Sequence, residues 1–498
     1  MEQKRKKVVI AGGGTAGWMA ANLFATKWQH LPIDIVLVES PDIGIIGVGE
    51  GSTPSLKRFF EILNISESDW MPQCNATYKL SITFAGWSPQ SGVEAYSHPF
   101  TSQVDTFTFK AFNMNCRTRR LGLDTHIKPG DFFINSVLSA QQKLPHAPTN
   151  FPFEIDYGYH FDAYMLGGFL AKHAKALGVT RVQQKIDSVK TDSTGNIRSL
   201  LLDNNEKIEG DLFIDCTGFA SLLIGKTLQS PFESFSENLF NDAAVVFPTE
   251  SLLPLPLETQ ATALSCGWAW RIPLVNRTGN GYVYASKYLS AQEAEEELRN
   301  HLQLDQHAKA RHLKMRVGQR SQHWQNNCLA VGLSQGFIEP LEATALHLVQ
   351  LTCEMFADNL CDNIGTLPVG EGWTTEGQKS FNKEIHNRFE KVRDYIVAHY
   401  KLNTRTDSQY WIDNRKNENL SASLMQVLSA WYQNKDMVAE INRLQLSEHF
   451  SANSWNAMLA GYGTFPTLAS SQPGTGDLYI EQKIQSFLAR CALNFAAS

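Results

Sequence analysis

The stretch that decides the fold lies near the start of the chain and reads VVIAGGGTAGWMA over residues 8–20. Residues 8–11 are a short apolar run, which predicts a buried strand. The glycines that follow lead into a predicted helix through Trp18–Thr26, and Ile33–Val38 reads as a second strand. This order predicts a β-α-β unit at the start of the chain.

The glycines of this unit have the spacing of a dinucleotide-binding turn. They read Gly12-x-Gly14-x-x-Gly17, and Glu39 ends the second strand about 20 residues further on. Such glycines let the backbone approach a pyrophosphate at the positive end of a helix, and the acid accepts hydrogen bonds from the adenosine ribose. The expected cofactor contacts in this unit are Gly12, Gly14, Thr15, Ala16, Gly17 and Glu39.

A later strand distinguishes FAD from NAD. Residues 211–218 read DLFIDCTG, an apolar strand that ends in Asp215 and is followed by a glycine turn. FAD enzymes of the hydroxylase type return the chain to the dinucleotide with such a strand. The sequence has no second GxGxxG for a separate nicotinamide domain. We therefore expect FAD as the cofactor, Asp215 near it, and electrons supplied by another protein.

Length and composition exclude several other classes of protein. The chain has 498 residues, 43% of them hydrophobic and 19% charged, and its formal net charge is −6. This balance argues against a nucleic-acid-binding protein. No apolar run is long enough to cross a membrane. The eight cysteines are scattered without metal-like spacing, so we expect reduced thiols, no metal site and a cytoplasmic location.

The rest of the chain indicates how the protein is organised. Leu346, Val349, Cys353, Phe356 and Leu360 recur at alternating spacings of three and four, which predicts a long helix over 342–361, and a similar stripe predicts another over 378–400. The last hundred residues are polar and mostly helical. We predict an α/β fold: an FAD-binding, Rossmann-like body of the flavin hydroxylase type over residues 1–400, with substrate-side insertions at about 75–160, and a mainly helical C-terminal part over 401–498 that contributes to the substrate pocket.

Residues 77–84 have the alternation of a half-buried strand. Tyr78, Leu80, Ile82 and Phe84 alternate with polar residues that include Lys79. On this pattern alone, Lys79 is a lysine on the solvent side of a strand. Its place in a family motif reverses that interpretation.

Three segments carry a resemblance to a known family. They are GVGEG at 47–51 followed by TYKLSITF at 77–84, GWAWRIP at 267–273, and GFIEPLEAT at 336–344. Together with the GxGxxG turn, they resemble the flavin-dependent tryptophan halogenases, whose signatures include W-x-W-x-I-P and a catalytic lysine. Supporting matches extend from Val8 to about Tyr400 and include YHFDAY at 159–164 and GYVYAS at 281–286.

The resemblance implies a reaction and the residues that perform it. A separate flavin reductase supplies FADH2, which with O2 and chloride or bromide gives hypohalous acid. The acid reaches Lys79, and an electron-rich ring is halogenated with the help of Glu342. The halide is expected near Thr344 and Ala345, where a helix start offers unpaired amides. Further contacts to FAD are expected from Gly49, Leu333, Thr344 and Ala345.

The resemblance leaves the substrate open. His98 and Phe100 match family positions that hold an indole ring, and Trp455 lies in the family's C-terminal substrate segment. The tryptophan-specific enzymes carry Ser where this chain has Ala343, and their paired tyrosines and acidic residue do not precede Trp455. Free indole or another small electron-rich arene is therefore as good a candidate as tryptophan. A homodimer is compatible with the sequence.

Three other interpretations share part of the pattern. A flavin monooxygenase that hydroxylates an aromatic ring would share the fold but have no use for Lys79, Glu342 or W-x-W-x-I-P. A catalytically silent FAD-binding or redox-sensing protein would share the cofactor site. His160-x-Asp162 resembles part of a non-haem iron site, although Asp162 lies where a helix N-cap belongs.

Overall fold

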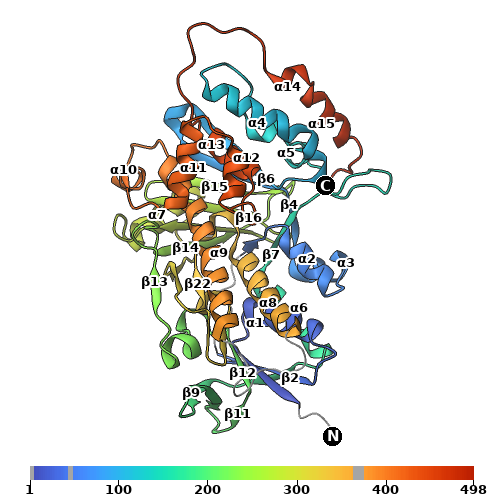
Figure 1. Ribbon diagram of the computed structural model, residues 1–498, viewed down its shortest axis with the longest axis vertical. Coiled ribbons are helices and arrows are strands. Elements are labelled where there is room, and N and C mark those ends of the chain that lie inside the picture. The colour runs from blue at the N-terminus through green and yellow to red at the C-terminus, as the bar shows by residue number, and fades with distance from the viewer. Residues whose placement is uncertain (1–4, 43–48, 363–374) are drawn as a thin grey trace. The chain divides into compact units, whose positions relative to one another are not determined.

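The computed structural model describes residues 5–42, 49–362 and 375–498 (Figure 1). Gly47 and Val48 of the GVGEG motif, and the side chain of Leu360, lie outside the described part of the chain. No helix among the described residues is both long enough and apolar enough to cross a membrane. The seven cysteines whose side chains are described are all free thiols.

The chain folds into two compact units, and each is made of three separate segments. Unit 1 comprises Met1–Ala76, Phe161–Phe235 and Arg316–Glu390. Unit 2 comprises Thr77–His160, Ser236–Met315 and Lys391–Ser498. The glycine turn thus lies in unit 1 and Lys79 in unit 2. The residue at which we divided the sequence, 400, lies inside one long helix, α9 (Thr375–Leu402).

Unit 1 is built on a sheet that begins with the predicted β-α-β unit. β1 (Lys6–Ala11) lies between β2 (Ile33–Glu39) and β12 (Leu212–Asp215), and all three are parallel. The described sheet has the order β20-β21-β12-β1-β2-β8. Its outer strands are β20 (Trp324–Gln325), β21 (Cys328–Ala330) and β8 (Thr180–Gln183). The predicted strands are confirmed, and the carboxyl ends of β1, β2 and β12 meet at the edge where dinucleotides bind in such folds.

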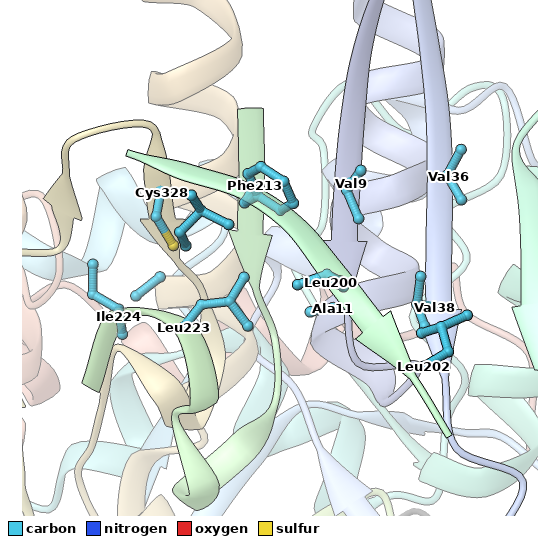
Figure 2. Close-up of a cluster of buried hydrophobic side chains, with 12 residues drawn as sticks. Val9, Ala11, Val36, Val38, Leu200, Leu202, Phe213, Leu223, Ile224 and Cys328 are labelled. Atoms are coloured by element: carbon cyan, nitrogen blue, oxygen red, sulfur yellow. The ribbon is translucent and has the colours of Figure 1, made fainter. Parts of the chain in front are cut away.

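One face of this sheet is covered by a crossing strand. Val9, Val36 and Phe213 point to the same side from neighbouring strands, and Leu200 and Leu202 pack on them from β10 (Ile197–Leu202) (Figure 2). β10 belongs to a small antiparallel sheet with β9 (Ile186–Thr191) and β11 (Lys207–Glu209). This buried apolar layer stabilises the central strands, because burial of each Val, Leu or Phe side chain contributes about 1.5–3 kcal/mol.

Helices cover the other face. α1 (Thr15–Lys27) begins directly after the glycine turn and packs between α6 (Ala163–Ala176) and α8 (Ala345–Asp362). α1 starts three residues before the predicted helix, because the residues after Gly14 already have helical geometry. The remaining helices and turns of unit 1 are α2 (Ser55–Ile62), α3 (Glu67–Trp70), η1 (Pro72–Cys74), η5 (Gly218–Ala220), the π-helix η6 (Leu222–Thr227), η7 (Gly332–Ser334) and η8 (Pro340–Glu342). Its other strands are β3 (Gly49–Gly51), β13 (Phe232–Ser234), β19 (Gly318–Arg320) and β22 (Gly336–Phe337).

Unit 2 contains a larger, mainly antiparallel sheet. The described strands follow the order β18-β14-β17-β16-β15-β5-β6. They span Arg311–Lys314, Ala243–Thr249, Thr278–Tyr284, Gly267–Pro273, Glu258–Leu264, Ser81–Ser88 and Val93–Pro99 in that order. The W-x-W-x-I-P segment is β16, at the centre of this sheet.

The helices of unit 2 come mainly from two stretches of sequence. The first stretch, with short turns, holds η2 (Pro89–Ser91), η3 (Gln103–Asp105), α4 (Thr106–Arg120), η4 (Pro129–Phe132) and α5 (Ile134–Ala140), and α7 (Ala291–His301) follows later. The last hundred residues form α10 (Gln409–Lys416), α11 (Ala422–Tyr432), α12 (Met437–Arg443), α13 (Ala452–Gly461), α14 (Leu478–Glu481) and α15 (Ile484–Ala492). α14 packs on α4, and α15 packs on α5 (Figure 1). The prediction of a mainly helical C-terminal part is confirmed.

The predicted strand over 77–84 is two strands. β4 (Thr77–Lys79) pairs with β7 (Gly158–Asp162), whereas β5 belongs to the large sheet. The break falls at Leu80, whose N–H donates to Leu257 O. Because the chain changes sheet here, Lys79 is fully buried. The interpretation from alternation alone, a solvent-facing lysine, is therefore wrong.

Candidate functional site

In the glycine turn of unit 1, a side chain at Gly12 or Gly17 would collide with the neighbouring backbone. Gly12 has φ +107°, and a Cβ there would lie 2.2 Å from Cys216 O. A Cβ at Gly17 would lie 2.0 Å from Gly12 O. At Gly14, by contrast, a Cβ would meet nothing within 4 Å. Gly12 and Gly17 therefore pack the turn against its surroundings, and the open space at Gly14 fits the close approach of a pyrophosphate.

Glu39 lies over this turn. A Cβ at Gly13 would lie 1.6 Å from Glu39 Oε2, so the carboxylate rests directly on the glycine backbone. Arg181, on the edge strand β8, donates from Nε to Glu39 Oε1 over 2.5 Å. The sequence motif treats position 13 as unrestricted and does not include Arg181. A carboxylate held by Arg181 over a glycine turn is suited to accept hydrogen bonds from the ribose of a dinucleotide.

The carboxylate of Asp215 accepts hydrogen bonds from the segment that follows β12. Its carboxylate is fully buried, where Oδ1 accepts from Thr217 N and Oγ1, and Oδ2 accepts from Leu223 N and Ile224 N. Burial raises the pKa of this carboxyl, while the four hydrogen bonds oppose that rise. The carboxylate thus caps the π-helix η6, and the backbone after it is held next to the glycine turn.

One further segment, η7, lies against the glycine turn of unit 1. A Cβ at Gly332 would lie 2.7 Å from Ala16 Cβ, so η7, which carries Leu333, packs on the glycine turn. Ser334 Oγ donates to Val331 O over 2.9 Å and also to Asp215 O. Leu333 and Ala16, two of the predicted FAD contacts, therefore lie on segments that pack against each other.

The predicted start of the long helix is different in detail. Glu342 ends the short turn η8, Ala343 has a left-handed conformation with φ +57°, and α8 begins at Ala345. Thr344 is buried and Ala345 is exposed. The prediction that Glu342 lies in the first turn of the long helix is therefore wrong. Glu342 lies before the left-handed residue Ala343, and the helix begins after that residue. The first amides of α8 follow this break and have no partner within the helix; the halide site there stays a prediction.

One partly buried acid of β3, Glu50, was not identified from the sequence. Burial, and secondarily the nearby Asp162 carboxylate, raise the pKa of Glu50 to about 7. Asp162 is the N-cap of α6 and accepts from Tyr164 N and Met165 N, which confirms the N-cap prediction. Glu50 follows Gly49, one of the predicted FAD contacts. Its position in a glycine-rich motif was the signal, but the charge of Asp162 beside it comes from a distant part of the chain.

Lys79 in unit 2 lies against an aromatic ring. Its Nζ is 5.5 Å from the centroid of the Phe100 ring. Phe100 is fixed by its backbone, because its N–H donates to Leu80 O over 3.0 Å and its carbonyl accepts from Asn135 Nδ2 over 2.8 Å. The structure therefore brings together two of the residues that we selected separately, a lysine for catalysis and a phenylalanine for the substrate.

The other two predicted substrate residues meet a third aromatic side chain. The ring centroids of His98 and Tyr395 are 5.9 Å apart, and those of Tyr395 and Trp455 are 4.8 Å apart. Phe450 stacks on Tyr395 at 3.6 Å. Trp455 itself is fully buried. Tyr395 thus links segments from both ends of unit 2, and no motif in the sequence singles it out.

His160 is a buried neutral histidine in this unit. Its Nδ1 is 3.1 Å from Thr77 Oγ1, and its Nε2 is 2.9 Å from Thr259 Oγ1. Burial, and then the positive charge of Lys79, hold its pKa well below the usual value. Both ring nitrogens are occupied by threonine hydroxyls. Among the described residues, no group of three or more metal-ligating side chains is present, so the structure gives no support to the iron-site interpretation.

The two tryptophans of β16 pack on one face of the large sheet. The ring centroids of Trp268 and Trp270 are 6.2 Å apart. Trp270 lies over Gly281 of β17, where a Cβ would be 2.2 Å from the indole ring. Ala261 is its neighbour on the other side. Small residues on both flanking strands therefore create the room for this ring.

Comparisons with known proteins place this geometry in a family. The family model described as tryptophan halogenase matches residues 7–474. The 7-chloro-L-tryptophan 6-halogenase KtzR of Kutzneria sp. (strain 744) is 36% identical over 457 residues, which cover 85% of this chain and 84% of the relative.

Two solved structures are similar over nearly the whole chain. The tryptophan 6-halogenase SttH of Streptomyces toxytricini has a TM-score of 0.84 at 30% identity, covering 99% of this chain and 98% of that one. BrvH, a flavin-dependent halogenase from Brevundimonas sp. BAL3, has a TM-score of 0.82 at 31% identity, with the same coverage of 99% and 98%.

Proposed function

Since the chain belongs to the tryptophan halogenase family and is a flavin-dependent halogenase, we propose that it places chlorine or bromine on an indole or similar arene in the cytoplasm. The substrate class is carried by one observation, the buried Lys79 beside the Phe100 ring. A lysine that is shielded from water next to an aromatic surface suits the delivery of an electrophile to a neutral ring.

FAD is the cofactor that the family implies. Bound in its reduced form, it would supply the activation of O2 that turns a halide into hypohalous acid. In this chain, the open backbone at Gly14 and the N-terminus of α1 would hold the pyrophosphate. Glu39 would accept the ribose hydroxyls, and Ala16, Leu333 and the turn after Asp215 would line the cofactor. The reduced flavin would come from a separate reductase.

Lys79 would act on the hypohalous acid. As an ammonium, it donates a hydrogen bond to the oxygen of the acid, which polarises the bond between oxygen and halogen. The ring carbon takes the halogen, and the oxygen leaves as water with the proton that it receives. This assignment to Lys79 is supported by its burial and by its place in the TYKLSITF segment.

Glu342 and the start of α8 would complete the reaction. By the family motif, the Glu342 carboxylate accepts the proton that the ring carbon loses. The backbone amides at Thr344 and Ala345 would hold the halide, because the first amides of a helix have no partner within the helix. These assignments are supported by the match to GFIEPLEAT and by the left-handed break at Ala343.

The aromatic surroundings favour a substrate without charged groups. Phe450 and Tyr395 form a stacked pair beside Trp455, in the segment where tryptophan-specific relatives carry a charged residue for the amino acid. We therefore propose free indole, or a small arene like it, ahead of L-tryptophan.

The test is a product analysis with a panel of substrates. The protein is incubated with FAD, a flavin reductase, NADH, O2 and either halide, and with indole, L-tryptophan or phenol. Mass spectrometry should show a product with the isotope pattern of chlorine or bromine, formed fastest from indole. A hydroxylated product would instead indicate a monooxygenase, and peroxide alone would indicate a silent flavoprotein. A clear preference for L-tryptophan would contradict the proposed substrate but not the reaction.

A further inference from the structure

Arg181 lies outside every motif that identifies the cofactor site, yet it contacts the acid of that site. It is on β8, where it pairs with Leu37 of β2, two residues before Glu39. Alternation along a strand therefore puts the side chains of Arg181 and Glu39 on the same face of the sheet. Arg181 Nε donates to Glu39 Oε1 over 2.5 Å, and Nη2 contacts the same oxygen.

The two oxygens of the Glu39 carboxylate have different environments. Nε and Nη2 of Arg181 both contact Oε1, whereas Oε2 lies against the backbone of Gly13. In the part of the chain that the structure describes, no donor is bonded to Oε2. The arginine thus occupies one oxygen and leaves the other over the glycine turn, where ribose hydroxyls would need an acceptor.

The guanidinium is itself held in place. It lies 5.7 Å from the centroid of the Trp18 ring, and Trp18 is buried in α1. The Glu39 side chain is only 13% exposed, and that of Arg181 is 41% exposed. The carboxylate is therefore mostly shielded from water, and the cation reaches it from the solvent side across a tryptophan surface.

The ion pair also balances charge. A pyrophosphate brings negative charge to the start of α1, and an unpaired carboxylate beside it would repel it. A cation fixed on that carboxylate removes this repulsion without occupying the acceptor oxygen.

We infer that Arg181 is a positioning residue for the adenosine half of the dinucleotide: by holding Oε1, it aims Glu39 Oε2 at the ribose hydroxyls. This inference rests on the proposed FAD site, and it adds to that site a residue that acts through Glu39. The double contact to one oxygen requires the fork of an arginine, so a lysine would replace it only in part.

The experiment measures the affinity for FAD by fluorescence titration of the full chain. R181M should weaken FAD binding at least about tenfold, or 1.4 kcal/mol, and R181K should fall between R181M and the unsubstituted protein. In an E39Q background, R181M should weaken binding by less than about twofold, because the carboxylate through which it acts is gone. A merely structural arginine would cost the same in both backgrounds.

Arg5 provides a matched control. Arg5 Nε contacts Asp34 Oδ1 over 2.7 Å, so it forms an arginine–carboxylate pair on the same strand β2, at the end away from Glu39. R5M should leave the affinity for FAD within about twofold of the unsubstituted protein. The melting temperature of each variant is measured in the absence of FAD.

The outcomes separate this inference from the proposed function. If R181M binds FAD as well as the unsubstituted protein does, or if R5M weakens binding equally, Arg181 has no special role and the cofactor site stands. If the loss in R181M persists undiminished with E39Q, Arg181 does not act through Glu39. If the unsubstituted protein binds no FAD, the proposed cofactor falls and this inference falls with it.

Discussion

The glycine turn of unit 1 and the lysine cluster of unit 2 are built in opposite ways. The turn is a contiguous stretch in which missing side chains at Gly12, Gly13 and Gly17 let backbone and carboxylate come close. The lysine cluster comprises two sets of contacts between distant segments, Lys79 with Phe100 and Tyr395 with His98 and Trp455. The geometry of the turn depends on the conformation of its backbone, whereas the environment of Lys79 depends on packing of side chains from distant segments. Substitutions should therefore fail differently in the two places.

Removal of the lysine should give the largest effect. K79A should lower the rate of halogenation at least about a hundredfold, because no other described residue in this cluster supplies an ammonium. Binding of FAD should change less than about twofold, since the glycine turn lies in the other unit. Product formation is followed by mass spectrometry and FAD binding by fluorescence. K110A, at an exposed lysine of α4, is the control. Full activity in K79A would remove Lys79 from the mechanism.

A series of alanines in the turn should separate folding from cofactor binding. G12A should lower the free energy of unfolding by more than about 1 kcal/mol, because it adds a Cβ at positive φ against Cys216 O. G13A should displace Glu39 and weaken FAD binding at least about tenfold.

G14A is the informative member of this series. Its Cβ meets no atom of the protein, so the melting temperature should stay the same while FAD binding weakens. Denaturant unfolding and fluorescence titration measure the two quantities. Unchanged FAD affinity in G14A would mean that the pyrophosphate does not pass over this residue.

Unit 2 should be sensitive to the loss of the hydroxyl group that bonds to His160. T259V keeps the shape of the side chain but removes the partner of His160 Nε2, so it should lower the free energy of unfolding by about 1–2 kcal/mol. T262V, on the opposite face of β15, should change it by less than about 0.5 kcal/mol. Denaturant titration measures both. Equal effects of the two variants would show that the hydrogen bond to His160 contributes nothing.

The smallest predicted effect is a dependence on pH in unit 1. Burial raises the pKa of Glu50 from 4.5 to about 7, so the folded protein holds an additional proton between these values. Stability due to this group is present below pH 4.5 and is lost as the pH rises through 7. The fall in melting temperature from pH 5 to pH 8 should be smaller in E50Q by at least about 2 °C. E61Q, at an exposed acid of α2, is the control. The same pH dependence in E50Q and the unsubstituted protein would contradict the raised pKa of Glu50.

The contrast between the two sites explains what the sequence could predict. Gly12, Gly17 and Glu39 were identified because a turn, a helix and a strand follow one another in the chain, and local spacing encodes their geometry. The long helices and the helical C-terminal part were predicted for the same reason, from the periodicity of apolar residues.

Most of the errors and omissions involve contacts between distant residues. The chain changes sheet at Leu80, so alternation across that residue gave the wrong environment for Lys79. Arg181 reaches Glu39 through strand pairing, and Tyr395 meets His98 and Trp455 through packing of the C-terminal segments. No spacing within a single segment encodes such contacts. The left-handed break at Ala343 was missed because alanine rarely adopts this conformation.

The indole ring of Trp270 rests on a residue that has no side chain. A methyl group at Gly281 would collide with the ring, so the orientation of the Trp270 indole depends on the absence of a side chain at Gly281. A substitution at Gly281 could therefore change the orientation of the indole ring while Trp270 itself stays unchanged. Comparisons that track only the conspicuous W-x-W pattern would overlook such a change.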